Sequence, residues 1–310
     1  MSSRQAPKVP SSKVVLLGSS GFIGNALLKR FRAIDDVSVS GYNSSALDLT
    51  SANFLEKLSL LLDQNTTLII AARARRTENS FADFQNNVAI ITHLAQCLER
   101  QAVKKCVYFS STAVYGDMIT NLDITEKTPA RPSTLYGVSK LVGECLLTQA
   151  AAKQRFPLLI LRPCMVYGPG DRGESYGPSQ FIELIETENQ VCVFGDGSEF
   201  RDYIFINDLV EITIRFALGN QQGVYNVACG QNYSFQQILS FLRKLADKKF
   251  EVCETKRIKP LASQKIVYDK LLSEIPGFQC TSFEEGLAQT YEFFSSQHVD
   301  TQEKQVKPVS

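Results

Sequence analysis

Short apolar runs alternate with amphipathic stretches along the first half of the chain. Residues 13–17 are mostly apolar, as in a strand buried on both faces, whereas apolar residues from Phe22 onward recur at helical spacing. Further strands are expected at 37–41, 67–72, 105–111 and 157–163, with helices at 51–62, 86–101 and 134–151. This alternation predicts an α/β fold built on a doubly wound parallel sheet.

The pattern changes after Pro163. Glycine and proline crowd the stretch "YGPGDRGESYGP", and shorter helical and strand-like segments follow it. We expect a first domain at 13–163, to which 203–229 returns, a smaller α/β lobe at 164–202 and 230–295, and tails at 1–12 and 296–310. A loop-rich lobe beyond the carboxyl ends of parallel strands is where a substrate commonly binds.

Composition narrows the class of protein. The chain has 310 residues, 44% hydrophobic and 21% charged, and a net charge of +1, so nothing draws it as a whole to nucleic acid or to an anionic membrane. It contains no apolar run long enough to span a bilayer, and the first twelve residues are polar, so we expect a soluble cytoplasmic protein.

Eight cysteines are scattered through apolar segments without CxxC or Cys/His spacing. Metal sites of cysteine usually show such spacing, and disulfides are uncommon in the cytosol. We therefore expect reduced thiols and no metal.

A glycine-rich loop separates the first strand from the first helix. Gly18, Gly21 and Gly24 stand three residues apart in "GSSGFIG". Glycines let the backbone approach a pyrophosphate, and a helix N-terminus offers N–H donors and partial positive charge. This position predicts a dinucleotide-binding loop.

The second expected strand bears on which dinucleotide binds. An acidic residue there commonly bonds the adenosine ribose, but none occurs between Ser38 and Ser45. Asn43, Ser44 and Ser45 could hydrogen-bond a ribose phosphate, although no arginine accompanies them. NAD and NADP both remain open.

Three residues further along could carry out chemistry. Ser111 follows an apolar strand, at the edge of a parallel sheet where catalytic groups collect. Tyr136 and Lys140 stand four residues apart in "YGVSK", on one face of a helix that Ser133 could cap. An ammonium beside a phenol lowers the phenol's pKa toward that of a general base.

Taken in order, these motifs resemble those of the extended short-chain dehydrogenase/reductases, in the nucleotide-sugar epimerase/dehydratase family. The matching segments are "GSSGFIG", "LDLTS", "IIAA", "QNNV", "FSSTAVYG", "YGVSK", "LRPCMVYGPG", "GDGSEFRDYIFINDLVE", "GVYNVACG" and "SFEEGL". The resemblance covers nearly the whole chain. It implies a Rossmann sheet that binds NAD or NADP, a smaller substrate-binding lobe, a nucleotide-sugar substrate and a homodimer.

The resemblance also implies roles for individual residues. Catalysis would use Ser111, Tyr136 and Lys140. The cofactor would contact Gly18, Gly21, Phe22, Ile23, Gly24, Asn43, Ser44, Asp48, Leu49, Ala71, Ala72, Arg73, Asn87, Tyr136, Lys140 and Cys164. The substrate would contact Ser111, Thr112, Met165 and Arg201, the last through its diphosphate, which suits a guanidinium fork.

Several positions depart from the family pattern. Thr112 and Ala113 stand where dehydrating members carry an Asp-Glu pair, which disfavours a 4,6-dehydratase. Met165 replaces an asparagine common in the family, which leaves the identity of the sugar in doubt. The cluster Arg73, Arg75 and Arg76 is either a solvated loop or a phosphate contact.

Two enzymatic hypotheses use the same Ser-Tyr-Lys set. A 4-epimerase would oxidise a sugar carbinol and reduce the ketone on its other face, whereas a 4-ketoreductase would use NADPH to reduce a preformed 4-keto-6-deoxy sugar once. A dinucleotide-binding scaffold without turnover is the third hypothesis, and the intact Ser111, Tyr136 and Lys140 count against it.

Overall fold

The computed structural model of the chain describes residues 11–51, 54–74, 77, 80–116, 123–172, 177–257 and 264–306. The chain divides into two compact units. Unit 1 comprises the residues up to 110 together with 134–161 and 210–224, and unit 2 comprises 111–133, 162–209 and the residues from 225 on. The stretch 111–133, which we expected in the first domain, groups with unit 2, where β5 (Asp123–Ile124) pairs with β13 (Lys265–Ile266).

The largest sheet among the described residues has six strands. Its order is β10-β6-β4-β3-β1-β2, and the pairs joining β6, β4, β3, β1 and β2 are parallel. The strands are β1 (Ser12–Leu17), β2 (Val37–Tyr42), β3 (Thr66–Ile70), β4 (Lys105–Phe109), β6 (Leu158–Pro163) and β10 (Gly223–Val227). The predicted α/β fold with a parallel sheet is confirmed.

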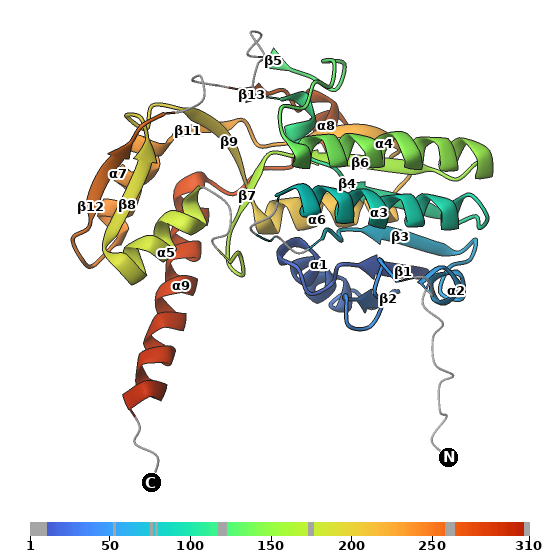
Figure 1. Cartoon of the computed structure of the whole chain (residues 1–310), viewed down its shortest axis with the longest axis horizontal. Helices are drawn as coiled ribbons and strands as arrows, with labels where there is room; N and C mark the ends of the chain where they lie inside the picture. Colours follow the sequence, from blue (N-terminus) through green and yellow to red (C-terminus); the bar gives the residue numbers. More distant parts are fainter. Residues whose placement is uncertain are drawn as a thin grey trace. The chain divides into compact units, whose positions relative to one another are not determined.

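Helices cover this sheet, as Figure 1 shows, with α3 and α4 lying side by side. The helices are α1 (Phe22–Arg32), α2 (Phe54–Ser59), α3 (Ser80–Leu98), α4 (Leu135–Gln154) and α6 (Ile206–Leu218). Alternate strand residues such as Val15 and Leu68 pack with Leu94 and Leu147 of α3 and α4 in one buried cluster. Every residue of β3 and β4 is buried, and burial on both faces explains why both strands are apolar after their first residues.

Unit 2 contains smaller sheets and its own helices. One sheet has the order β11-β9-β7, and β8 pairs in parallel with β12. These strands are β7 (Met165–Tyr167), β8 (Gln190–Phe194), β9 (Phe200–Phe205), β11 (Gln231–Ser234) and β12 (Glu251–Thr255). A short 3-10 helix, η1 (Thr112–Tyr115), precedes α5 (Pro178–Glu188), α7 (Phe235–Leu245), α8 (Asp269–Glu274) and α9 (Phe283–Val306).

The last helix differs from the predicted boundary. We expected a tail from residue 296, but α9 continues to Val306. Among the described residues, no helix is both long and apolar enough to cross a membrane.

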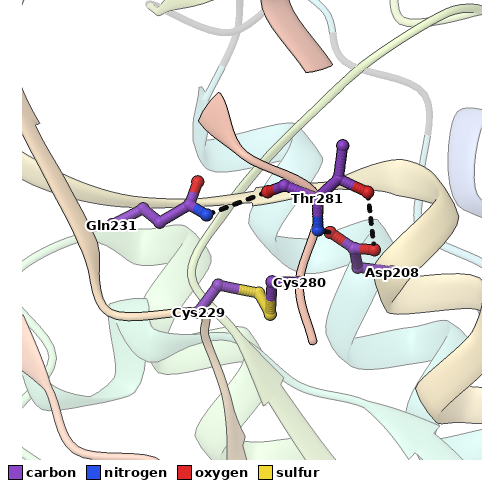
Figure 2. The surroundings of a disulfide bond; sticks show 5 residues. All are labelled: Asp208, Cys229, Gln231, Cys280 and Thr281. Atoms are coloured by element: carbon purple, nitrogen blue, oxygen red, sulfur yellow. Dashed lines mark hydrogen bonds between the residues drawn. A yellow bond between two sulfur atoms is a disulfide. The ribbon is translucent and has the colours of Figure 1, made fainter. Parts of the chain in front are cut away.

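The expectation of eight reduced cysteines is wrong for four of them. Cys192 and Cys253 are directly opposite each other on β8 and β12 and form a disulfide. Cys229 and Cys280, 51 residues apart, form a second one (Figure 2). The spacing of cysteines along the chain could not reveal these pairs, because the fold brings each pair together across more than 50 residues.

The Cys229–Cys280 bond lies in a hydrogen-bonded corner of unit 2. Asp208, in the first turn of α6, accepts from the backbone N–H and the hydroxyl of Thr281, at 2.9 and 3.0 Å. Gln231 donates to the carbonyl of Thr281 at 2.8 Å (Figure 2). Three potential metal ligands, Asp208 and the two cysteines, come within 4.8 Å here, but the disulfide removes both thiolates as ligands.

Opening this disulfide is expected to destabilise unit 2. A cross-link between residues 51 apart lowers the conformational entropy of the unfolded chain, which raises the free energy of unfolding by about 4 kcal/mol. Cys280→Ser should therefore lower the melting temperature by several degrees under oxidising conditions, and by much less in excess dithiothreitol. Equal melting temperatures in oxidising buffer, with thiol titration showing Cys229 free in both proteins, would contradict this expectation.

Candidate functional site

The loops that follow β1 and β3 meet at one edge of the sheet. Gly18 has φ +86°, and a Cβ there would lie 2.6 Å from the backbone nitrogen of Ala72. The Ala71 N–H donates to Leu17 O at 3.0 Å, and the Gly18 N–H donates to Tyr42 O at 2.8 Å. Strand order reverses between β1 and β3, and open α/β sheets bind ligands at such a reversal.

The N-terminus of α1 opens at this same edge. Gly21 is its N-cap residue, and no side chain caps the helix, so the first backbone N–H groups, those of Phe22 and Ile23, have no side-chain acceptor at the cap. A Cβ on Gly24 would lie 2.0 Å from Gly18 O, so the helix can pack this closely against the loop only with a glycine at this position. The bare backbone of this loop and helix start fits the pyrophosphate of a dinucleotide.

The loop after β2 is held by its own side chains. Asn43 Oδ1 accepts from the Ala46 N–H at 2.9 Å, and Asp48 Oδ1 accepts from the hydroxyl and the N–H of Thr50. These hydrogen bonds to Thr50 keep the pKa of Asp48 below its ordinary value. Ser44 is exposed and Leu49 is buried. Of these predicted cofactor contacts, Asn43 and Asp48 thus shape the loop.

The loop after β3 is braced from α3. Asn87 Oδ1 accepts from the Ala74 N–H at 2.9 Å, while its amide nitrogen donates to Asp83 O at 2.7 Å. Asn87 therefore uses both ends of its side chain to fix the backbone just beyond Ala72. Arg73 is exposed. The other two members of the arginine cluster, Arg75 and Arg76, lie outside the described residues.

The two predicted catalytic residues of α4 differ sharply in exposure. Thr134 caps this helix by accepting from the Gly137 N–H at 3.1 Å, where we had expected Ser133. The Tyr136 side chain is 43% exposed, whereas Lys140 is buried. Lys140 Nζ lies 5.6 Å from the centre of the Tyr136 ring, on the same helix face.

Lys140 is held at the carboxyl end of β4. Its Nζ donates to Phe109 O at 2.8 Å and lies 5.3 Å from the centre of the Tyr108 ring. Burial, with a smaller contribution from the charge of Arg73, lowers the pKa of Lys140 to about 8. The ammonium is thus a fixed positive charge at neutral pH that can lose its proton in mildly alkaline solution.

Sequence reasoning missed a third member of this helix face. Glu144, four residues beyond Lys140, is buried and accepts a hydrogen bond from Ser110 Oγ at 2.5 Å. The hydroxyl of Ser110, the residue before the predicted Ser111, therefore points to α4 and bonds a side chain of that helix. The repeat of polar residues at 136, 140 and 144 was the available signal.

A small hollow in unit 1 brings several predicted residues together. Its lining consists of Ile70, Ala72, Asn87, Ile90, Ile91, Tyr108, Ser139 and Lys140. Gly143 allows this packing, because a Cβ there would lie 2.2 Å from the Tyr108 hydroxyl. The predicted cofactor contacts at the end of β3 and on α3 thus face the predicted catalytic lysine.

In unit 2, the residues after β4 begin the short helix η1. Ser111 Oγ accepts from the Ala113 N–H at 3.2 Å and so caps this helix, which Thr112 starts. At the other end of η1 the buried Tyr115 hydroxyl donates to Asn226 Oδ1 at 2.6 Å and accepts from Arg162 Nη1 at 2.9 Å. This network, which we did not predict, fixes the strand ends that flank the serine.

The remaining predicted residues of unit 2 lie on β7, β9 and the link before β7. Met165 pairs with Tyr203 in the β7–β9 register and is half-buried. Cys164 is buried, and burial together with the neighbouring Asp202 carboxylate keeps the pKa of its thiol well above the ordinary value. Burial also raises the pKa of Asp202 to about 6. Arg201, next to it, is ion-paired with Glu199.

Comparison with known proteins gives a consistent family. Residues 14–228 match the NAD dependent epimerase/dehydratase family. A UDP-glucose 4-epimerase of Mycolicibacterium smegmatis is 26% identical over 91% of this chain and 98% of its own. MoeE5, solved in complex with UDP-glucose and NAD, is 26% identical, with a TM-score of 0.81 over 92% of this chain and 99% of that one.

Dehydrating relatives also match, over a shorter stretch. A mouse dTDP-D-glucose 4,6-dehydratase is 28% identical over 166 residues, 53% of this chain. The matched stretch spans less than half of that relative's length, 46%.

Two glycines of the dinucleotide loop should behave differently when replaced. A Cβ on Gly21 would lie 3.4 Å from Gly18 O, an ordinary contact, so Gly21→Ala should leave the melting temperature within about 2 °C of wild type while weakening dinucleotide binding at least tenfold. Gly24→Ala should weaken binding and also lower the melting temperature, because its Cβ meets backbone. Unchanged dinucleotide affinity in Gly21→Ala, measured by calorimetry, would contradict this assignment.

Lys140→Met should remove the free-energy cost of burying an ammonium in the folded chain. Since the pKa of Lys140 is about 8 in the folded chain and 10.5 ordinarily, the unfolded chain binds the extra proton between these values, and wild-type stability rises with pH across this window. The excess stability of Lys140→Met over wild type should therefore shrink by up to about 3 kcal/mol from pH 8 to 10.5. A pH-independent difference in denaturant unfolding would contradict this.

Proposed function

The chain belongs to the NAD-dependent epimerase/dehydratase family, and from that premise we propose that it is a 4-epimerase of a nucleotide-diphosphate sugar that uses NAD or NADP. The observation that carries the proposal is the placement of Lys140, buried on α4 with its Nζ 5.6 Å from the ring of an exposed tyrosine of the same helix. Matching proteins solved with UDP-glucose and NAD and relatives named as 4-epimerases support it.

Tyr136 is the proposed acid–base residue. The ammonium of Lys140 favours the phenolate form of Tyr136, which takes the proton of the sugar hydroxyl. The resulting phenol gives this proton back when the sugar carbon is reduced again. A bound nicotinamide supplies the hydride acceptor and donor for oxidation and reduction of the sugar carbon. From the family resemblance we assign Ser111 a hydrogen bond to the same sugar oxygen.

The cofactor is assigned to the loop edge of unit 1. The N–H groups of Phe22 and Ile23 bind its pyrophosphate, while Ala71, Ala72 and Asn87 line its path toward Lys140. NAD and NADP are both compatible with the loop after β2, which offers the exposed Ser44 hydroxyl and no carboxylate between Ser38 and Ser45.

Arg201 is assigned to the diphosphate of the nucleotide-sugar. It lies on β9 in unit 2, and a guanidinium offers paired N–H donors that match phosphate oxygens. Thr112 and Met165 are assigned to the sugar, in line with the family resemblance.

Elimination of water is disfavoured, although dehydratases are among the relatives. Proton abstraction next to the ketone and loss of a hydroxyl need carboxyl groups beside the catalytic hydroxyl. The helix η1, at Thr112–Tyr115, carries no carboxyl group.

A 4-ketoreductase is the second candidate. The absence of an acid between Ser38 and Ser45 modestly favours NADPH, which commonly drives reductions, and the same Ser111, Tyr136 and Lys140 would serve a single reduction of a 4-keto sugar. We also propose a homodimer and a cytoplasmic location, for which light scattering and fractionation are the direct measurements.

Tyr136→Phe tests the catalytic assignment. The wild type should convert one member of a panel of UDP-, dTDP-, GDP- and CDP-sugars into its C4 epimer with no net change in the absorbance of reduced nicotinamide. Loss of the phenolic proton donor should lower kcat by at least a hundredfold while dinucleotide affinity stays unchanged.

Tyr291→Phe is the matched control, since it also removes one hydroxyl, which binds Glu186 on α5. It should keep wild-type turnover. Unchanged kcat in Tyr136→Phe for every accepted sugar would refute the assignment. Stoichiometric consumption of NADPH with a 4-keto sugar would favour the reductase. No conversion of any sugar would favour a dinucleotide-binding scaffold without turnover.

A further inference from the structure

A largely buried carboxylate forms an ion pair with Arg201, the arginine that we assign to the substrate diphosphate. Glu199 lies in the loop between β8 and β9, and its side chain is only 12% exposed. One carboxylate oxygen pairs with Arg201 Nη2, and the other pairs with Arg257 Nη1 at 2.5 Å. Glu199 thus bridges two guanidinium groups.

Arg257 fixes the carboxylate in this bridging position. Its Nη2 donates to Phe194 O at 3.0 Å, at the end of β8, and lies 4.0 Å from the carboxylate of Asp196. Gly195 makes room for the guanidinium, because a Cβ there would lie 3.0 Å from Arg257 Nε. The arginine is therefore held by the β8–β9 loop itself.

The charges of this group cancel. Arg201 and Arg257 carry two positive charges, and Asp196 and Glu199 carry two negative ones. A diphosphate approaching Arg201 therefore meets a carboxylate already paired with the same guanidinium. Repulsion between the two anions opposes binding, and a diphosphate must displace Glu199 to pair with Arg201 Nη2.

We infer that Glu199 opposes diphosphate binding: it holds Arg201 in an internal ion pair, and an incoming diphosphate must displace it from Arg201. The inference rests on the assignment of Arg201 to the diphosphate in the proposed function. Glu199 lowers affinity for any diphosphate by the same amount, so a ligand needs further contacts, to the base or the sugar, to be bound at a given concentration.

Glu199→Gln tests this role while keeping the size of the side chain and one of its two acceptor oxygens. Titrated with inorganic pyrophosphate, the variant should bind about three- to tenfold more tightly than wild type, because one opposing charge is gone. The gain should disappear in Glu199→Gln/Arg201→Gln. With the accepted nucleotide-sugar, KM should fall and kcat should stay unchanged.

Glu186→Gln is the matched control. Glu186 is equally buried, with 12% of its side chain exposed, and it pairs with Lys248 at 3.3 Å in the same unit. Its variant should bind pyrophosphate like wild type. Thermal unfolding of both variants checks that each is folded at the titration temperature.

Pyrophosphate affinity that is unchanged or weaker in Glu199→Gln would overturn the inference, since Glu199 would then be neutral or would position Arg201 for the ligand. A gain that survives in the double variant would also overturn it. Pyrophosphate carries neither base nor sugar, so this result is read separately from the proposed function, which fails if wild-type protein turns over no nucleotide-sugar.

Discussion

The hydrogen bond from Lys140 Nζ to Phe109 O joins the helix that carries the tyrosine to the carboxyl end of β4. Burial of an ammonium is costly, and here a carbonyl acceptor and the faces of the Tyr108 and Tyr136 rings offset part of the cost. The cost that remains appears as a pKa of about 8 for Lys140. The buried charge of Lys140 fits the part in acid–base chemistry that we propose for it, beside the phenol of Tyr136.

This constraint determines what surrounds the lysine. Gly143 must lack a side chain for the Tyr108 ring to lie against α4, and Ser110 must turn toward Glu144 on the next turn of the helix. The loop after β3 is fixed from the other side by Asn87. The small hollow between these elements is lined by residues of β3 and the loop after it, α3, β4 and α4, among them Ala72, Asn87 and Lys140.

Sequence patterns predicted the features that depend on local spacing. The buried strands, the glycine loop after β1 and the shared face of Tyr136 and Lys140 all follow from residues within a few positions of each other. Contacts across long stretches of chain were not predictable in this way. The Cys229–Cys280 bond and the bridge from Glu199 to Arg257 each depend on how unit 2 folds, because the partners are 51 and 58 positions apart in the chain. Asn43, predicted to contact a cofactor, accepts a hydrogen bond from the Ala46 N–H and so shapes its own turn. Asparagine side chains commonly bond backbone N–H groups a few residues further along in this way.

The central claim is that the chain oxidises and then reduces one sugar carbon without losing water. The direct measurement uses nucleotide-sugars deuterated at carbon 4, with the product analysed by mass spectrometry and NMR. The account predicts a C4 epimer of unchanged mass that retains deuterium at carbon 4. A product lighter by one water, or one that has exchanged its carbon 4 deuterium for hydrogen, would contradict it.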